Sequence, residues 1–341
     1  MIDGHGDDIH RYANIRINFS SNVYSHFEHG KMFAYLASRL DAIKNYPEPA
    51  PYRAEKAIAA AIDLQPAQVM LTNGATEAIY LVGQTFRHNL STILTPTFSE
   101  YADACKMHEH TITFVTSLSD LPATTQLVWL CNPNNPTGAV YAKNHLLQCV
   151  KCHPDILFII DSSYAPFTRE PLITPIEAVN FPNIIMLHSM TKAFAVPGLR
   201  LGYITANERL LNKIRQQRMP WAVSTLAQDA CCYLLAHKGD YQIPLGTLLQ
   251  ERERVSKALA DTGTVDVYPS HSHILLCKLH NGSASDLKKL LAGQYGILIR
   301  DASNFEGLSG KHFRIAVQTA AENDRLLKSV TTILLQHSSN K

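Results

Sequence analysis

The chain has 341 residues, enough for one large domain and a smaller one with a sizeable apolar core. Hydrophobic residues make up 46% and charged residues 18%, a balance that excludes an intrinsically disordered protein. The 31 lysines and arginines against 29 aspartates and glutamates leave a net charge of +2, which argues against nucleic acid or a membrane surface as a partner. No apolar run reaches membrane-spanning length and the N-terminus lacks the pattern of a signal peptide, so we expect a cytoplasmic protein.

The first expected element is an amphipathic helix that a proline-rich stretch, residues 46–51, would end. Its apolar face would consist of Phe33, Leu36, Leu40 and Ile43.

Short apolar runs then alternate with helical patterns such as Glu77–Phe86 and Asn207–Arg218. The expected strands are Val69–Thr72, Thr92–Thr95, Ile112–Val115, Leu127–Cys131, Leu157–Asp161, Ile184–Leu187 and Leu201–Thr205. They are nearly continuous in valine, isoleucine and leucine, as strands covered on both faces should be. The alternation predicts an α/β fold, a three-layer α/β/α large domain with a mainly parallel seven-stranded sheet.

The C-terminal part has a different pattern. A long helix is expected from about Tyr241 to Ala260, followed by strand-like segments and a last amphipathic helix. The segments are Val265–Tyr268, His273–Leu279, Ile297–Arg300 and Phe313–Val317. This pattern predicts a smaller α+β domain that the N-terminal segment joins. The expected division is residues 31–236 for the large domain, and 1–30 with 237–341 for the small one.

The most informative motif is Ser189-Met190-Thr191-Lys192, directly after the expected strand Ile184–Leu187, with Arg200 eight residues later. A lysine amine condenses with an aldehyde, while two hydroxyls and an arginine bind a phosphate. The motif therefore predicts a site for a phosphorylated aldehyde, pyridoxal 5′-phosphate, with Lys192 holding it as a Schiff base and Ser189, Thr191 and Arg200 around the phosphate. Taken alone, the motif is equally compatible with a solvated loop lysine.

Other strand ends carry complementary groups. Residues 72–77 open a helix whose N-terminal N–H groups at Ala75 and Thr76 suit a phosphate, although a plain turn and helix cap would look the same. Asp161 ends a strand, where an ionised carboxylate could keep a pyridine nitrogen protonated, and Tyr164 follows it. A helix N-cap beside a packing tyrosine is the alternative there.

Two further loops complete the set. Asn135 lies in a turn-rich loop after Leu127–Cys131 and could reach the phenolic oxygen of a pyridoxal ring, as could Tyr164. Phe98 follows another strand and could stack on the ring. Five strand ends in chain order thus offer parts of one site.

Together these segments resemble the fold-type-I pyridoxal-phosphate enzymes, the aspartate-aminotransferase superfamily, over almost the whole chain. The positions that match the family's cofactor-binding and catalytic motifs are Asn135, Asp161, Tyr164, Lys192 and Arg200. The resemblance also implies that Tyr46 reaches the cofactor phosphate of a neighbouring subunit, so that a homodimer shares its active sites.

Within the superfamily, two groups compete: the L-threonine-O-3-phosphate decarboxylases and the histidinol-phosphate aminotransferases. Residues 4–6, 19–22, 215–221 and 297–300 are similar to the decarboxylases, and Val23 stands where the aminotransferases carry an acid. The decarboxylase resemblance implies that four residues surround the substrate phosphate and carboxylate, namely His5, Asn22, Arg300 and Arg314. Gln318, where the decarboxylases carry an arginine, and the sequence Asp161-Ser162-Ser163 depart from the pattern.

The resemblance implies decarboxylation of L-threonine O-3-phosphate, with transamination of a phosphorylated or aromatic amino-acid substrate as the alternative and a catalytically silent cofactor-binding protein as a third possibility. The cluster His108-Glu109-His110 resembles a metal site, but it lies between an expected helix and strand. We expect it at the surface and expect no metal.

Overall fold

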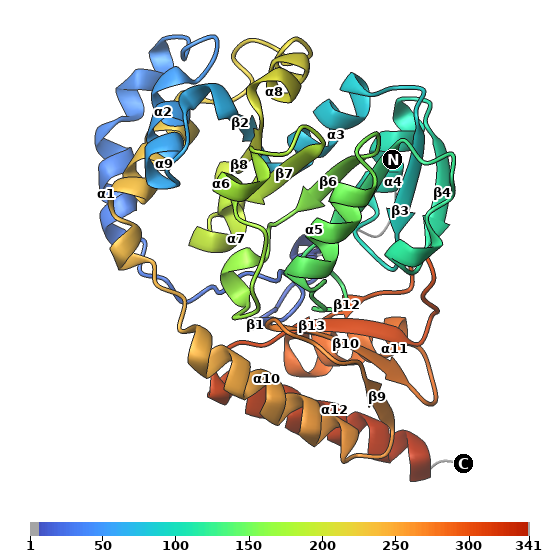
Figure 1. The fold of residues 1–341 in the computed structure, drawn as a ribbon. Helices are drawn as coiled ribbons and strands as arrows, with labels where there is room; N and C mark the ends of the chain where they lie inside the picture. Colours follow the sequence, from blue (N-terminus) through green and yellow to red (C-terminus); the bar gives the residue numbers. More distant parts are fainter. Residues whose placement is uncertain (1–6, 340–341) are drawn as a thin grey trace.

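The computed structural model describes residues 7–339, and its centre is a seven-stranded sheet with the order β2-β8-β7-β6-β5-β3-β4 (Figure 1). The strands are β2 (Val69–Asn73), β3 (Leu90–Leu94), β4 (Thr111–Val115), β5 (Leu127–Cys131), β6 (Leu157–Asp161), β7 (Ile184–Ser189) and β8 (Leu201–Ala206). β8 runs antiparallel to both of its neighbours, and the pairs from β7 to β4 are parallel. The prediction of a mainly parallel seven-stranded sheet is confirmed.

Helices cover both faces of this sheet because successive side chains of a strand point to opposite sides. On β5, Trp129 packs in a cluster with α3 (Gly74–Thr85) and α4 (Glu100–Met107), whereas Val128 packs with α5 (Lys143–Cys152). The other helices on or near this sheet are α1 (Gly30–Ser38), α2 (Tyr52–Ala61), α6 (Pro175–Ala178), α7 (Met190–Phe194), α8 (Glu208–Arg215) and α9 (Thr225–Ala236). The seven-stranded sheet and the helices on its two faces therefore form the predicted three-layer α/β/α arrangement.

A second, four-stranded sheet has the order β12-β13-β10-β9, and β1 pairs with β11 beside it. These strands are β1 (Ile17–Asn18), β9 (Val265–Val267), β10 (Ile274–Leu279), β11 (Ile297–Leu298), β12 (Arg300–Asp301) and β13 (His312–Ala316). Its helices are α10 (Leu245–Ala260), α11 (Ala284–Leu290) and α12 (Ala320–Ser339), and α10 and α12 lie side by side in Figure 1. The domain division at residues 31 and 237 remains a prediction.

Within residues 7–339, no helix combines the length and the apolar character that crossing a membrane requires.

The expected strand Ile297–Arg300 is divided in the structure, because its two ends pair with different partners. Ile297 pairs with Ile17 of β1, whereas Arg300 pairs with Arg314 of β13. Arg300 lines the cavity described below.

The N-terminal helix is shorter than expected. α1 ends at Ser38, and a 3₁₀ helix, Leu40–Lys44, follows it. Phe33, Leu40 and Ile43, which were expected to share the apolar face of one helix, are 61%, 52% and 63% exposed. An apolar surface of this kind marks a site of association rather than a core.

The expectation that residues 108–110 lie at the surface was wrong for His110. Its ring is buried, with Nδ1 2.8 Å from Oγ of Ser91 and Nε2 2.8 Å from the carbonyl oxygen of Gly83. The side chain therefore joins α3 to β3 as a structural bridge.

Candidate active site

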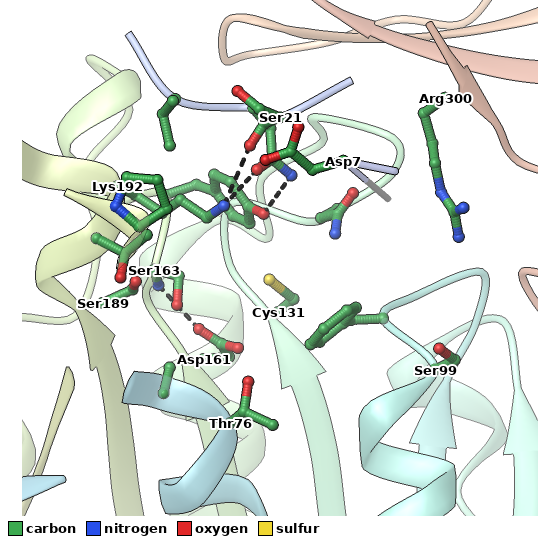
Figure 2. Close-up of a pocket in the computed structure, with 18 of the residues that line it drawn as sticks. Asp7, Ser21, Thr76, Ser99, Cys131, Asp161, Ser163, Ser189, Lys192 and Arg300 are labelled. Atoms are coloured by element: carbon green, nitrogen blue, oxygen red, sulfur yellow. Dashed lines mark hydrogen bonds between the residues drawn. The ribbon is translucent and has the colours of Figure 1, made fainter. Parts of the chain in front are cut away.

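A cavity of about 220 Å³ lies at the carboxyl ends of β5, β6 and β7, between the two sheets. This is the edge at which open α/β sheets bind ligands. Its lining includes the predicted residues Asn22, Ala75, Thr76, Phe98, Asn135, Asp161, Tyr164, Ser189, Thr191, Lys192, Arg200, Arg300 and Arg314. Figure 2 shows Lys192 reaching toward Ser21 on one side, Asp161 below it and Arg300 on the far side.

Lys192 lies in the short helix α7, which starts directly where β7 ends. Its amine donates to the side-chain oxygen of Asn22 and to the carbonyl oxygen of Ser21, the latter at 3.3 Å. Burial, with Arg314 and Arg200 nearby, lowers the pKa of Lys192 to about 7. A large share of the amine is therefore uncharged near neutral pH, as a nucleophile that attacks an aldehyde must be.

One end of the cavity suits a phosphate. Oγ1 of Thr191 is buried and has no hydrogen-bond partner among residues 7–339, so it is free to bind a ligand. Gly74 begins α3 with a φ of +82°, and a Cβ there would collide with the guanidinium of Arg200. A Cβ at Gly202 would likewise collide with the backbone nitrogen of Ala75. Small residues thus let Arg200 and the N-terminus of the 12-residue helix α3 come together around one anion site.

Asp161 is buried at the end of β6. Its Oδ2 accepts a 2.7 Å hydrogen bond from the hydroxyl of Tyr101, and its Oδ1 accepts from the backbone N–H of Ser163 at 2.9 Å. Burial raises the pKa of Asp161, whereas these hydrogen bonds and Lys192 lower it, and the net direction is upward. A buried carboxylate of this kind needs a cationic partner, which a protonated ring nitrogen would supply.

Asn22 links two of the predicted groups. Its amide nitrogen donates to the hydroxyl oxygen of Tyr164 at 2.7 Å while its amide oxygen accepts from Lys192. Because the Tyr164 oxygen already accepts a bond, its own proton remains available to a ligand. Burial raises the pKa of Tyr164, so the phenol stays protonated.

Arg300 and Arg314 bring two guanidinium groups to the cavity from paired positions on β12 and β13. Arg314 is buried, and it donates to the carbonyl oxygen of Ser20 and to Oδ1 of Asn135, the latter at 2.7 Å. Its Nε has no partner among the described residues. The structure thus places the amide of Asn135 on Arg314.

Arg300 is also buried, and it donates to Oδ1 of Asn304 at 2.7 Å and lies 5.4 Å from the ring centre of Phe305. Burial and the neighbouring Arg314 lower the pKa of Arg300 to about 10. Two buried cations side by side favour a ligand with two anionic groups.

The cavity also contains residues that the sequence analysis did not select. Asp7, Tyr101, Ser163 and Phe305 line it. Tyr101 lies three residues from the selected Phe98, and Ser163 lies two residues from the selected Asp161. This spacing could have indicated that both residues lie near the site. Asp7 lies two residues from the selected His5, whereas Phe305 lies five residues from Arg300 and carried no such signal.

One predicted residue, Tyr46, does not line this cavity. Tyr46 is 84% exposed and its ring lies 5.3 Å from that of Trp221, on the surface of the chain. His5 lies outside the described residues.

The site can be compared with known proteins. The model of the family "Aminotransferase class I and II" matches residues 14–330. The threonine-phosphate decarboxylase of Salmonella typhimurium is 29% identical over 354 residues, 97% of this chain and 96% of that protein. The histidinol-phosphate aminotransferase of Caldanaerobacter subterraneus is 30% identical over 303 residues, 85% of this chain and 84% of that protein.

Among solved structures, the L-threonine-O-3-phosphate decarboxylase from Porphyromonas gingivalis matches with a TM-score of 0.91 and 34% identity, over 94% of this chain and 99% of that one. The arrangement of Lys192, Asp161 and the phosphate-binding end of the cavity agrees with the family match and with the similarity of the folds. The chain therefore belongs to the class I and II aminotransferase family and is a pyridoxal-5′-phosphate-dependent enzyme of fold type I.

Proposed function

We propose that the protein decarboxylates L-threonine O-3-phosphate to aminopropanol phosphate, a step of the cobalamin pathway. The observation that carries the proposal is the pair of buried arginines, Arg300 and Arg314, in register on β12 and β13. Threonine phosphate has one phosphate and one carboxylate, and two guanidinium groups can bind both through charge-assisted hydrogen bonds. Val23, where an acid would repel an anionic substrate, is buried and apolar.

The cofactor would be held by groups that the cavity already provides. The phosphate would bind at Ser189, Thr191, Arg200 and the N-terminus of α3, and the aldehyde would join Lys192. Asp161 would keep the ring nitrogen protonated, and Tyr164 would donate to the phenolic oxygen. When bound, pyridoxal phosphate supplies an electron sink for the bond that breaks at the substrate Cα.

The choice of reaction would then depend on orientation. The bond that breaks would be the substrate bond that the protein aligns with the π system of the bound cofactor. Arg314 and Arg300 would fix the carboxylate and phosphate and so select the Cα–carboxylate bond. If the Cα–H bond were held there instead, the amine of Lys192 would remove the proton and transamination would follow.

A direct assay tests the proposal. Purified enzyme is incubated with L-threonine phosphate and CO₂ release is measured. In parallel, it receives histidinol phosphate with 2-oxoglutarate, and glutamate is measured. We expect CO₂ without glutamate, and glutamate without CO₂ would overturn the proposal.

The second candidate is transamination of the histidinol-phosphate type, with 2-oxoglutarate and glutamate as the keto-acid pair. It is favoured by the 30% identity to an aminotransferase of that kind. Histidinol phosphate has a phosphate but no carboxylate, so it would satisfy only one of the two arginines at a time. The parallel assay distinguishes the two candidates.

We also propose a homodimer in which Tyr46 completes the neighbouring site. Its support is a set of exposed apolar side chains on α1, on the segment from α1 to the first residue of α2, and on the segment after α8. The exposed large side chains there are Phe33, Leu40, Ile43, Tyr46, Tyr52, Met219 and Trp221. A patch of aromatic and aliphatic side chains of this kind is typical of a dimer interface.

A further inference from the structure

The segment Ser20–Val23 crosses the cavity between the two sheets, and it is held there by side chains. Arg314 donates to the carbonyl oxygen of Ser20. Nε2 of His273 lies 3.4 Å from the carbonyl oxygen of Asn22. Nε2 of Gln318 donates to the carbonyl oxygen of Val23 at 3.0 Å. Three side chains in or beside the small sheet thus contact the backbone of this segment.

His273 and Gln318 are well placed to hold this segment still. His273 directly precedes β10 and Gln318 follows β13, and the backbone N–H of Val317 donates to the carbonyl oxygen of His273 at 2.9 Å. The ring of His273 stacks on Phe167 with 3.8 Å between centres. Both side chains are buried, so their orientation cannot relax into solvent.

The protonation state of His273 follows from its surroundings. Burial lowers the pKa of His273 to about 3, so the ring is neutral at ordinary pH. A carbonyl oxygen can only accept, so the proton lies on Nε2, which faces Asn22. Nδ1 then has no partner among the described residues, and the same is true of Oε1 of Gln318. Leaving these two buried atoms unpaired costs stability. The two side chains are therefore better explained by the bonds that they donate to Asn22 and Val23 than by a contribution to stability.

The held segment in turn holds Lys192. Ser21 offers its carbonyl oxygen to the amine at 3.3 Å, and Asn22 offers its amide oxygen while its amide nitrogen binds Tyr164. Asn22 has a φ of +49°, a left-handed conformation that needs support from its surroundings.

We propose that His273 and Gln318 are positioning residues, which hold the backbone of Asn22 and Val23 so that Ser21 and Asn22 receive the free amine of Lys192. The inference rests on the proposed role of Lys192, but it applies to decarboxylation and transamination alike. It assigns Gln318, a departure from the decarboxylase pattern, to the segment rather than to the substrate.

The proposal predicts the direction in which the pKa of Lys192 changes when His273 or Gln318 is substituted. The oxygens of Ser21 and Asn22 favour the charged amine, so their loss lowers its pKa. The other groups that face the amine are Asp7 and Asp161, which raise its pKa, and Arg314 and Arg200, which lower it. The phenol of Tyr164 lies with its ring centre 5.9 Å from Nζ and stays neutral. Substitutions at His273 and Gln318 leave all of these groups in place.

The test uses the full-length protein stripped of cofactor. Pyridoxal phosphate is added at a series of pH values and the rate of reconstitution is followed by absorbance, because only the uncharged amine attacks the aldehyde. His273→Phe keeps the stack on Phe167 and removes the donor, and Gln318→Leu removes the other donor at similar volume. His110→Phe, at another buried histidine that does not line the cavity, is the control.

We expect His273→Phe and Gln318→Leu each to move the midpoint of the pH dependence down by about half a unit or more and to lower the plateau rate several-fold. His110→Phe should lower the melting temperature but leave the midpoint unchanged. If the two site variants lower only the melting temperature, the inference is wrong. If wild type does not form a Lys192-dependent cofactor band at all, the proposed function fails instead. Gln318→Leu removes only the bonds that the amide donates to the carbonyl oxygens of Val23 and Ala316, so it keeps the test available should His273→Phe not fold.

Discussion

The hydroxyl of Tyr101 donates a 2.7 Å hydrogen bond to Oδ2 of Asp161, at a point where both side chains are buried. Tyr101 comes from α4 and stacks on Trp129 of β5, with 5.9 Å between ring centres. The phenol is therefore fixed by packing, and it determines where the carboxylate points. Burial and Asp161 raise the pKa of Tyr101 well above its usual value, so the proton stays on the phenol and the bond to the carboxylate persists.

Replacing Tyr101 by phenylalanine should weaken catalysis without abolishing it. A hydrogen bond to a charged group contributes about 1.5–3 kcal/mol, so its loss raises the pKa of Asp161 further and weakens its hold on a cationic ring nitrogen. We expect kcat to fall roughly tenfold and cofactor affinity to fall as well. Steady-state rates and cofactor titration measure both, and an unchanged kcat with an intact fold would contradict the role of the bond.

The stability of the cofactor-free protein should depend on pH through Lys192. Its pKa of about 7 lies below the usual 10.5, so between these values the unfolded chain holds a proton that the folded chain lacks. The contribution of Lys192 to the free energy of unfolding therefore increases as the pH rises from 7 toward 10.5. Thermal unfolding of wild type and Lys192→Met from pH 6 to pH 9.5 measures the difference. Parallel curves for the two proteins would rule out a buried, low-pKa lysine.

Asp7 should weaken the binding of anionic substrates. Its carboxylate lines the cavity near Lys192 and Arg314, and its electrostatic influence reaches both groups. Asp7→Asn keeps the shape and tolerates the φ of +62° found there. Removing the repulsion should lower KM for an anionic amino acid roughly fivefold, equivalent to about 1 kcal/mol. Asp155→Asn, an exposed aspartate at the opposite edge of the sheet, is the control and should leave KM unchanged.

Arg218 should be important for stability rather than for chemistry. It forms a 2.5 Å ion pair with Glu55, and both side chains are largely buried, with exposures of 10% and 5%. Glu55 also accepts the backbone N–H of Leu71 at 3.1 Å. Arg218→Met would leave a buried carboxylate without its cation and should cost about 3–5 kcal/mol. Lys44→Met, in the exposed pair with Asp41, should cost less than about 1 kcal/mol in the same denaturant titration.

The proposed dimer can be tested by mixing two defective variants. Lys192→Ala removes the cofactor lysine, and Tyr46→Ala removes the group that would reach the neighbouring site. If Tyr46 acts across the interface, each mixed dimer contains one intact site and one doubly defective site. Random reassociation should then restore about a quarter of wild-type activity. No recovery after verified exchange of subunits would place Tyr46 outside the neighbouring site.

The amino-acid sequence by itself determined the large sheet and most of its functional edge. The seven strands are apolar runs bounded by turn residues, and Lys192, Asp161 and Asn135 directly follow or end such runs. Parallel strands bring their carboxyl ends to one edge, so local patterns were enough to bring these residues together. The resemblance to a known family then supplied Arg314 and Tyr46, which no local pattern selects.

Only the tertiary structure decided which distant groups act on that edge. His273 meets Asn22 across about 250 residues of chain, Gln318 meets Val23 across about 300, and Asp7 enters the cavity from the N-terminal segment. The tertiary structure also placed the predicted apolar face of the first helix on the surface and divided the expected strand Ile297–Arg300. These outcomes depend on which surfaces pack together, and side chains that meet through packing need no common spacing in the sequence.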